Sequence, residues 1–434
     1  MKILVAGAGH GGLTAAAILA KAGHSVTVYE KQNPEDIGYD WEDRFTFSLL
    51  SDIVGKNAPA SEWRYRGDCA FVSPNGQTSV VINYTDENRQ KIMQRKYIIR
   101  ALIENAQKNG VEIKFGTSVA APTVSGSTVT GLVTFDGEVS GDLVIDAAGA
   151  FSPVRSNLPA SFGIEKSPSR GDVFYAYRAY FSKKDGCTMS KVPFEVYLRH
   201  NDEQGLSWFC ENSDSVDILI GRIDPLSDER IEKNIDIFRK SHPCTGDKKL
   251  LGGRGIIPVR RPLALMVANG YAAVGDSAFM TTPMNGMGLD LSLQAGKLLA
   301  ETVITGNNAS AKTLWKYNRD FHVLYGGDTA KNESLKNALL NLPDGGVDFL
   351  FKNGVIQASD LAGAGRNTNL GALLGKFVRG MKNPPFFFAI LGGIMNGGKL
   401  SKVLKSAPAE FDLKQIGEWQ NKVIAASVKV TRGG

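Results

Sequence analysis

Three glycines near the N-terminus, Gly7, Gly9 and Gly12, occur at the spacing of a turn that binds a dinucleotide. In such a turn the first glycine permits a tight change of direction, the second lets the backbone approach a pyrophosphate, and the third lets a helix pack closely on a strand. Glu30 follows at about the distance where a carboxylate would accept hydrogen bonds from ribose hydroxyls. These residues indicate a nucleotide-binding site.

The residues around the glycines supply the strand, helix and strand that such a site requires. Residues 3–6 are apolar and predict a first strand, a helix is expected from about Gly12 to Lys21, and Val26 and Val28 alternate in a second strand. The helix would direct its N-terminal amides and its dipole toward the phosphates. Because the charge of Glu30 would repel a 2′-phosphate, we expect FAD or NAD.

A later glycine-rich stretch, residues 270–303, has the pattern of a strand, Gly275-Asp276, a loop and a helix. Asp276 at the end of a buried strand can accept a hydrogen bond from a ribityl hydroxyl. The loop from Pro283 to Gly288 can bring bare amides to the flavin N1/O2 edge at a helix N-terminus, where negative charge accumulates on reduction. The two stretches together indicate FAD, because NAD alone would not require the second.

A third turn, from Asp146 to Arg155, follows an apolar strand at residues 143–145. With the motifs above, it resembles the second fingerprint of the flavoproteins built like para-hydroxybenzoate hydroxylase, a superfamily of aromatic hydroxylases, flavin halogenases and geranylgeranyl reductases. The hydroxylases usually have Asp-Gly where this chain has Ala148 and Gly149, and that motif is associated with cofactor and NAD(P)H handling. Asp146 is more similar to the reductase and halogenase version.

The resemblance covers about residues 1–40, 93–160 and 250–305. It also implies that Arg95, in a helix that Gly110 ends, contacts FAD. We therefore expect the cofactor site to comprise Gly7, Gly9, His10, Gly11, Gly12, Glu30, Lys31, Arg95, Gly149, Asp276, Pro283, Gly286, Met287 and Gly288.

Between these motifs, aromatic and β-branched residues alternate with polar ones in segments that predict a second sheet, at residues 78–84, 172–181, 194–200, 206–211 and 216–224. Tyr177, Tyr197 and Trp208 are its candidates for a substrate cavity. The strand of Trp208 partly resembles the YxWxFP strand of geranylgeranyl reductases, with Leu206 in place of the Tyr. A core position fits Trp208 equally well.

The predicted fold class is α/β: a Rossmann-like FAD-binding domain interleaved with a mixed β-sheet substrate domain and followed by a mostly helical C-terminal region. The expected bounds are 1–65, 90–168 and 250–308 for the FAD-binding domain, 66–89 and 169–249 for the substrate domain, and 309–434 for the helical region. The aromatic and charged stretch at residues 31–50 either lies across the cofactor or packs on the surface.

The resemblance implies an FAD-dependent oxidoreductase with two alternative reactions. In the first, reduced flavin transfers hydride from N5 to a carbon-carbon double bond of an apolar, isoprenoid-like substrate, which Ala148, the Trp208 strand and the apolar C-terminal region favour. In the second, a flavin C4a-hydroperoxide hydroxylates or epoxidises an apolar or aromatic substrate. A non-catalytic electron-relay role is a minor third alternative. The external electron donor would be NAD(P)H or ferredoxin, and no residue is identified as a catalytic acid or base.

Composition and charge limit the classes of partner that we expect this chain to bind. The net charge of +6 over 434 residues comes without a dense basic run interleaved with aromatics, so we expect no nucleic acid. The five histidines and four cysteines show no metal-ligand spacing, and we expect no metal, with free thiols in a reducing, cytoplasmic setting. The apolar stretch from Pro384 to Met395 is shorter than the ~20 residues of a spanning helix. We interpret it as core or a tunnel wall, with a peripheral membrane or oligomer contact as the alternative.

Overall fold

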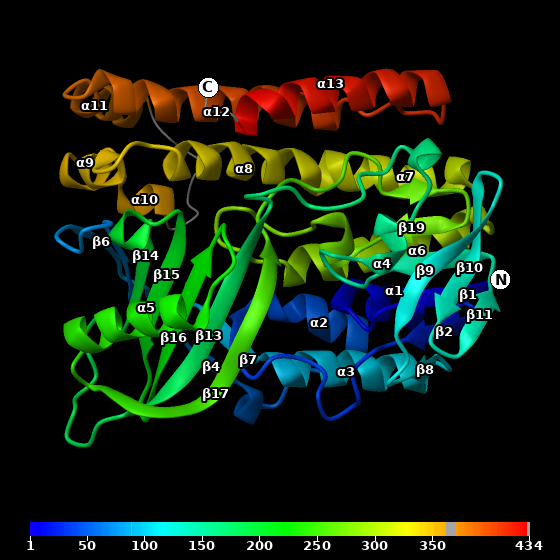
Figure 1. Ribbon diagram of the computed structural model, residues 1–434, viewed down its shortest axis with the longest axis horizontal. Helices are drawn as coiled ribbons and strands as arrows, with labels where there is room; N and C mark the ends of the chain where they lie inside the picture. Colours follow the sequence, from blue (N-terminus) through cyan, green and yellow to red (C-terminus); the bar gives the residue numbers. More distant parts are fainter. Residues whose placement is uncertain (88, 362–369, 432–434) are drawn as a thin grey trace.

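The computed structural model describes residues 1–87, 89–361 and 370–431. In the view of Figure 1, a sheet that contains the N-terminal strand lies on the right, a larger sheet lies on the left, and long C-terminal helices run across the top of both. The predicted fold class is confirmed, including the helical C-terminal region.

The N-terminal strand is central in a six-stranded sheet of order β18-β19-β12-β1-β2-β8. Five of its strands run parallel, and only β18 pairs antiparallel. Ile3, Leu4 and Val5 are fully buried because helices cover the sheet, as expected for parallel strands. The bounds are β1 Lys2–Ala6, β2 Ser25–Tyr29, β8 Glu112–Lys114, β12 Leu143–Asp146, β18 Val267–Ala268, β19 Tyr271–Ala273, α1 His10–Lys21, α3 Arg95–Lys108 and α6 Leu289–Gly306.

Two three-stranded sheets accompany it. One is a meander of β9 Val119–Ser125, β10 Thr128–Thr134 and β11 Gly137–Ser140, and the other has the order β3-β7-β4. The second small sheet joins the two large sheets, because its strand β7 leads directly into α3 and Asp43 of β3 forms an ion pair with Arg178 of the larger sheet. Its bounds and those of the nearby short helices are β3 Glu42–Arg44, β4 Trp63–Tyr65, β7 Lys91–Gln94, α2 Phe47–Val54, α4 Pro153–Ser156, η1 Ala60–Glu62, η2 Ala160–Phe162 and η4 Gly275–Ala278.

The larger sheet is seven-stranded and mixed, with the order β17-β13-β16-β15-β14-β5-β6. All neighbours are antiparallel except β14 and β5. One face is covered by α5 Asp228–Ser241, which contributes Ile231, Ile235 and Phe238 to the packing. The boundary expected at residue 250 falls inside β17, which pairs with β13 as far as Pro258. The bounds are β5 Cys69–Val72, β6 Ser79–Ile82, β13 Val173–Lys183, β14 Phe194–Leu198, β15 Gly205–Glu211, β16 Ser215–Arg222, β17 Thr245–Pro258 and η3 His200–Asp202.

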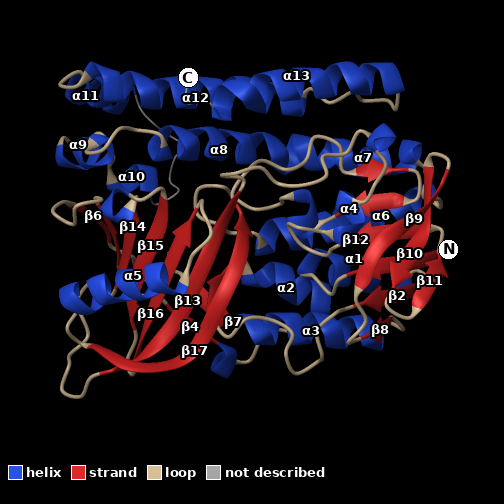
Figure 2. Cartoon of the chain, in the orientation of Figure 1, coloured by secondary structure: helices blue, strands red, loops and turns tan. Residues whose placement is uncertain are grey.

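The remaining helices form the layer at the top of Figures 1 and 2. They are α7 Ala311–Phe321, η5 His322–Gly326, α8 Gly327–Leu340, α9 Gly346–Lys352, α10 Ala358–Leu361, α11 Leu370–Gly380, α12 Pro384–Lys405 and α13 Leu413–Thr431. A buried cluster that includes Trp315, Leu400 and Trp419 joins α7, α12 and α13. Among the described residues, no helix has both the length and the hydropathy to cross a bilayer.

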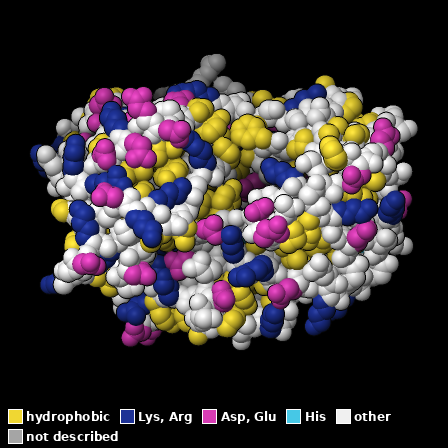
Figure 3. Space-filling model, turned by 60° about the horizontal axis from the view of Figure 1, so that its bottom comes forward, with side chains coloured by type: hydrophobic (Ala, Val, Ile, Leu, Met, Phe, Trp, Pro, Cys, Tyr) yellow, Lys and Arg dark blue, Asp and Glu magenta, His cyan; other side chains and the backbone are white. Residues whose placement is uncertain are grey.

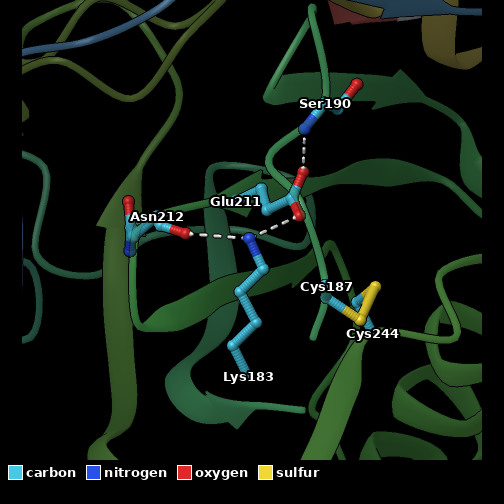
Figure 4. The surroundings of a disulfide bond; sticks show 6 residues. All are labelled: Lys183, Cys187, Ser190, Glu211, Asn212 and Cys244. Atoms are coloured by element: carbon cyan, nitrogen blue, oxygen red, sulfur yellow. Dashed lines mark hydrogen bonds and ion pairs between the residues drawn. A yellow bond between two sulfur atoms is a disulfide. The ribbon is translucent and has the colours of Figure 1, made fainter. Parts of the chain in front are cut away.

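The expectation of four free thiols is wrong for two cysteines. Cys187 and Cys244 form a disulfide, with Cα atoms 5.9 Å apart (Figure 4). They lie beyond the paired ends of β13 and β17, where Lys183 faces Thr245. This antiparallel pairing brings together residues 57 apart in the chain, which their spacing could not reveal. Cys69 and Cys210 are free and buried.

The interpretation of residues 384–395 as core is also wrong in part. Phe386, Phe387 and Ile390 on α12 are half-buried against a cluster formed with α8 and α9. Phe388 and Ile394, in contrast, are each more than half exposed. One side of this helix therefore packs on the protein and the other faces outward.

Candidate cofactor and substrate site

At Gly7 and Gly9 the turn after β1 is packed so tightly that no side chain would fit. Gly7 has φ +87°, and a Cβ there would lie 2.7 Å from the carbonyl oxygen of Ala147. A Cβ on Gly9 would lie 2.9 Å from the same oxygen. Because Ala147 follows β12, which pairs directly with β1, the obstacle is backbone that cannot move without disturbing the sheet. Bare amides are thus presented at the start of α1, as a pyrophosphate site requires.

The backbone beside this turn holds Glu30. Its side chain ends next to the turn, where one carboxylate oxygen accepts the N–H of Ala8 at 2.8 Å and the other accepts the N–H of Gln32 at 2.9 Å. The residue is only 7% exposed. Each oxygen keeps a lone pair for a further donor, so the carboxylate is fixed where ribose hydroxyls could reach it. Lys31, the next predicted residue, is exposed.

Three predicted residues from distant parts of the chain meet at the start of α3. Arg95 donates to Asp43 at 2.7 Å and also acts electrostatically on His10 and Asp276. Burial, with help from the Arg95 charge, lowers the pKa of His10 to about 3, so this imidazole is neutral. Its Nε2 is buried with no partner among the described residues, and an orphaned polar atom in this position fits a bound group.

Opposing effects act on the two carboxyl groups beside Arg95. Burial raises the pKa of Asp276, while Arg95 and a hydrogen bond from Thr281 oppose the shift. Asp43 is only partly buried, and the charges of Arg95 and Arg178 outweigh the effect of burial and lower its pKa. Asp43 therefore neutralises the arginines, which leaves Asp276 available to accept a hydroxyl.

The loop after Asp276 closes on itself before α6 begins. Thr282 donates its N–H to Met287 at 2.8 Å, and the N–H of Gly286 donates to Thr282 at 2.9 Å. Gly286 has φ +69°, and Gly288 caps α6. The loop thus ends at the N-terminus of an 18-residue helix, whose dipole stabilises negative charge. Pro283, Gly286, Met287 and Gly288 all lie in this loop, and their contact with the flavin edge stays a prediction.

The turn that contains Gly149 contacts the residue next to Asp276. Gly149 donates its N–H to Ser277 Oγ at 2.9 Å, next to Asp276. Asp146 is fully buried and accepts hydrogen bonds from Ser152 and Tyr271 at 2.6 and 2.9 Å. Asp146 therefore joins β12 to β19 and to the start of α4.

The aromatic stretch after β2 packs inward. Trp41 is buried and stacks on Tyr39, with ring centroids 4.0 Å apart. Asp43, two residues on, contacts Arg95 on one side and Arg178 of β13 on the other. The inner residues of this stretch therefore lie between the predicted cofactor residues and the seven-stranded sheet, and their position across the cofactor stays a prediction.

A buried ion pair lies on the sheet side of this stretch and was missed by the sequence analysis. Arg178 and Asp217 are almost completely buried, with 2.6 Å between Nη2 and Oδ2. Trp208 donates Nε1 to Asp217 at 3.3 Å, and its ring lies 5.0 Å from the Arg178 guanidinium. The sequence did contain a sign of this pair, because Arg178 and Asp217 are each a charged residue within a mostly apolar strand.

The structure separates the three predicted cavity residues. Trp208 and Val196 are paired neighbours on one face, in an apolar group with Phe194 and Phe71 that we call the inner face. Tyr197 pairs with Ser207, one position along, and therefore points to the other face, where it contacts Phe238 of α5. Tyr177 also packs on that side. Tyr177 and Tyr197 therefore do not share a face with Trp208, because neighbouring strand positions alternate between faces. The three residues cannot all line one cavity on this sheet, and the role of each stays a prediction.

Known proteins match this arrangement. A family model described as FAD binding domain matches residues 1–323. The digeranylgeranylglycerophospholipid reductase of Sulfolobus acidocaldarius is 23% identical, with 97% of this chain and 96% of that protein covered. Two solved structures share the fold. A geranylgeranyl bacteriochlorophyll reductase-like protein from Thermoplasma acidophilum has TM-score 0.72 and 18% identity, covering 91% of this chain and 99% of that one. A probable FAD-dependent monooxygenase from Pseudomonas aeruginosa has TM-score 0.57 and 19% identity, covering 79% and 97%.

Proposed function

The chain belongs to the FAD binding domain family and is an FAD-dependent oxidoreductase, and from this premise we propose that it reduces a carbon-carbon double bond of an apolar, isoprenoid-like substrate. The name of the full-length reductase relative supports that substrate class. When bound and reduced, FAD would supply the two electrons. We propose that Glu30, Arg95, Asp276 and the loop from Pro283 to Gly288 hold it.

The observation that carries the proposal is a row of apolar side chains, which we call the apolar path, that leads from the inner face to the cofactor loop. Met284, inside that loop, packs in a cluster with Phe386 and Phe387 of α12 and with Phe71 of β5. Phe71 also belongs to the inner face with Trp208. An apolar chain lying along this path would be kept from water and held close to the loop.

The test is anaerobic turnover of the reduced, flavin-loaded protein with a geranylgeranyl lipid. We expect reoxidation of the flavin together with a product that gains two hydrogen atoms per double bond, measured by mass spectrometry. The monooxygenase alternative, which the Pseudomonas structure favours through its fold, predicts no anaerobic product and the gain of an oxygen atom in air. We propose that the external electron donor is either NAD(P)H or a ferredoxin. Parallel titrations with NAD(P)H and with a reduced ferredoxin would identify which of them reduces the flavin.

We also propose a peripheral membrane contact at α11 and α12. Val378 is 64% exposed, and large apolar side chains continue along both helices at Phe377, Met381, Phe388, Ile394 and Met395. Exposed groups of this kind are uncommon on a monomer unless they meet a partner or a lipid surface. A lipid substrate would reach the apolar path through the packed side of the same helix.

Charge supports an anionic lipid surface as the partner. Residues 361–409 contain seven Lys and Arg and no Asp or Glu, so this stretch alone carries +7, and the rest of the chain carries −1 of the overall +6. On the face shown in Figure 3, in contrast, acidic and basic side chains are interspersed. Each basic residue near an anionic membrane contributes about 1 kcal/mol of attraction.

Vesicle sedimentation tests this contact. We expect the protein to bind phosphatidylglycerol vesicles at least about tenfold more tightly than phosphatidylcholine vesicles, and Val378→Ser with Phe388→Ser to weaken that binding. Phe135→Ser is the matched control, because Phe135 is 87% exposed but lies between β10 and β11. Equal binding of both vesicle types, or equal losses from the α11–α12 variant and the control, would rule the contact out.

A further inference from the structure

One lysine of the helical layer contacts both direct connections between the two large sheets. The chain passes from β12 of the six-stranded sheet to β13 of the seven-stranded sheet, and it returns from β17 to β18. The Nζ atom of Lys336, on α8, donates to the carbonyl oxygen of Gly171 before β13 at 3.2 Å. It also donates to the carbonyl oxygen of Val259 after β17 at 2.7 Å. Because α8 runs above both sheets (Figure 1), a residue on it can hold one sheet in place relative to the other.

The two connections also bind each other. The N–H of Val259 donates to the carbonyl oxygen of Asp172 at 2.8 Å, and Arg260 Nη1 lies 3.1 Å from the carboxylate of the same aspartate. These contacts continue the pairing of β13 with β17 beyond the ends of both strands. The two connections therefore form one unit, and Lys336 attaches that unit to α8.

The end of β17 approaches the cofactor loop. A Cβ placed on Gly286 would lie only 3.0 Å from Cγ2 of Ile257, near the end of the strand. Ile257 is two residues from Val259 and packs in one cluster with it and with Leu340 of α8. The position of this strand end therefore sets the width of the space between the seven-stranded sheet and the loop that we propose holds the flavin.

Lys336 is an expensive residue to bury for this purpose. It is only 4% exposed, and an apolar side chain of similar length would fill the same space without the cost of removing an amine from water. Its two bonds to carbonyl oxygens are what an apolar side chain could not provide. The chemistry of Lys336 thus serves the position of the two connections more than the packing of α8.

The charge of this amine changes near neutral pH. Burial lowers the pKa of Lys336 to about 8. The carboxylates of Glu333 on α8 and Asp172 before β13 oppose this shift, and the charge of Arg260 after β17 adds to it. Below this pH the amine is charged, and hydrogen bonds from a charged donor are roughly twice as strong as those from a neutral one. The contacts with Gly171 and Val259 therefore weaken as the pH rises through this pKa.

We propose that Lys336 is a positioning residue that fixes the end of β17 against the cofactor loop and so sets the distance between the substrate and the flavin. The proposal rests on the proposed function, because hydride transfer requires closely placed reacting atoms, and a misplacement of about 1 Å can lower its rate about 100-fold. Lys336 takes no part in the chemical step and acts through Val259 and Ile257.

The first test is Lys336→Met in single anaerobic turnovers of the reduced, flavin-loaded protein with a geranylgeranyl lipid. We expect the rate of flavin reoxidation at saturating lipid to fall about tenfold or more, while the half-saturating lipid concentration and the flavin content stay unchanged. Lys331→Met is the matched control, because Lys331 is exposed on the same helix. An unchanged rate in Lys336→Met, or equal losses in both variants, would overturn the assignment.

The pH profile is a second test, and it remains informative if Lys336→Met fails to fold. In the unmodified protein the saturating rate should fall as the pH rises through about 8, because the amine loses its proton there. Lys336→Met should be slow across the whole range and show no such fall. A rate in the unmodified protein that is constant between about pH 7 and 9 would contradict the role of Lys336.

Amide hydrogen exchange separates this proposal from the proposed function, because it does not depend on the reaction. On the flavin-loaded protein, the amide of Val259 should exchange faster in Lys336→Met than in the unmodified protein, and Lys331→Met should leave it unchanged. Faster exchange at Val259, together with no double-bond reduction by the unmodified protein, would refute the proposed function and still support the positioning of β17. Unchanged exchange there would overturn it.

Discussion

Main-chain atoms shape the cofactor turn, whereas side chains form the inner face of the seven-stranded sheet. At Gly7 and Gly9 the obstacle to any side chain is the backbone of Ala147, which a sheet holds in place. Around Trp208, in contrast, the contacts are made by side chains such as Val196, Phe194 and the Arg178–Asp217 pair. A rigid backbone tolerates no added side chain, whereas a surface of side chains can adapt. We therefore expect substitutions in the cofactor turn to abolish flavin binding, and substitutions on the inner face to weaken substrate binding by degrees.

The largest effect is expected at the turn. Gly9→Val should leave a folded protein that retains almost no flavin, because the new Cβ would meet the Ala147 oxygen at 2.9 Å. The measurement is the ratio of flavin to protein absorbance after purification. Gly253→Val in β17 is the matched control, since a Cβ there meets nothing within 4 Å. A Gly9→Val protein with a full complement of flavin would show that the turn is not the pyrophosphate site.

The next effect concerns the stability of the sheet. Arg178→Met leaves Asp217 buried without its ion-pair partner, and we expect a loss of about 3–5 kcal/mol in the free energy of unfolding. Denaturant titration measures it. Adding Asp217→Leu should restore much of the loss, because the uncompensated charge is then gone. If the single and double variants are equally destabilised, the charge is not the cause.

A further loss is expected from the disulfide. Replacing Cys187 and Cys244 with serine frees a loop of 57 residues and should lower the free energy of unfolding by about 2–4 kcal/mol. Flavin content should not change, since the bond joins the outer ends of β13 and β17. Parallel denaturant and absorbance measurements check both statements. Loss of flavin in this variant would mean that the far end of the sheet supports the cofactor turn.

The same contrast between backbone and side chains decides how much could be predicted from the sequence. Glycine spacing reports a backbone requirement directly, so Gly7, Gly9 and Glu30 were found, and the structure brings His10, Arg95 and Asp276 together as expected. Their contact with FAD stays a prediction. Five of the seven strands of the larger sheet were also located, because alternation is a local pattern, whereas β5 and β17 were not predicted.

What the sequence did not reveal depends on pairing between strands. Alternation shows that Tyr197 and Trp208 lie on regular strands, but only register shows that they face opposite ways. The Cys187–Cys244 bond and the partner of Asp43 likewise arise from residues brought together by pairing. The prediction of a core position for residues 384–395 of α12 was wrong in part, because an apolar run indicates burial but does not show which side of the helix is buried.

The smallest effect compares the two faces of the sheet. Trp208→Phe should raise the KM for an isoprenoid substrate by up to about tenfold with little change in flavin content, because the ring borders the inner face. Tyr197→Phe should leave KM unchanged, since Tyr197 packs against α5 and its hydroxyl donates to Glu195. Steady-state kinetics on both variants measures the difference. If Tyr197→Phe raised KM as much as Trp208→Phe, the substrate would have to contact the α5 side, and the inner face would lose its assignment.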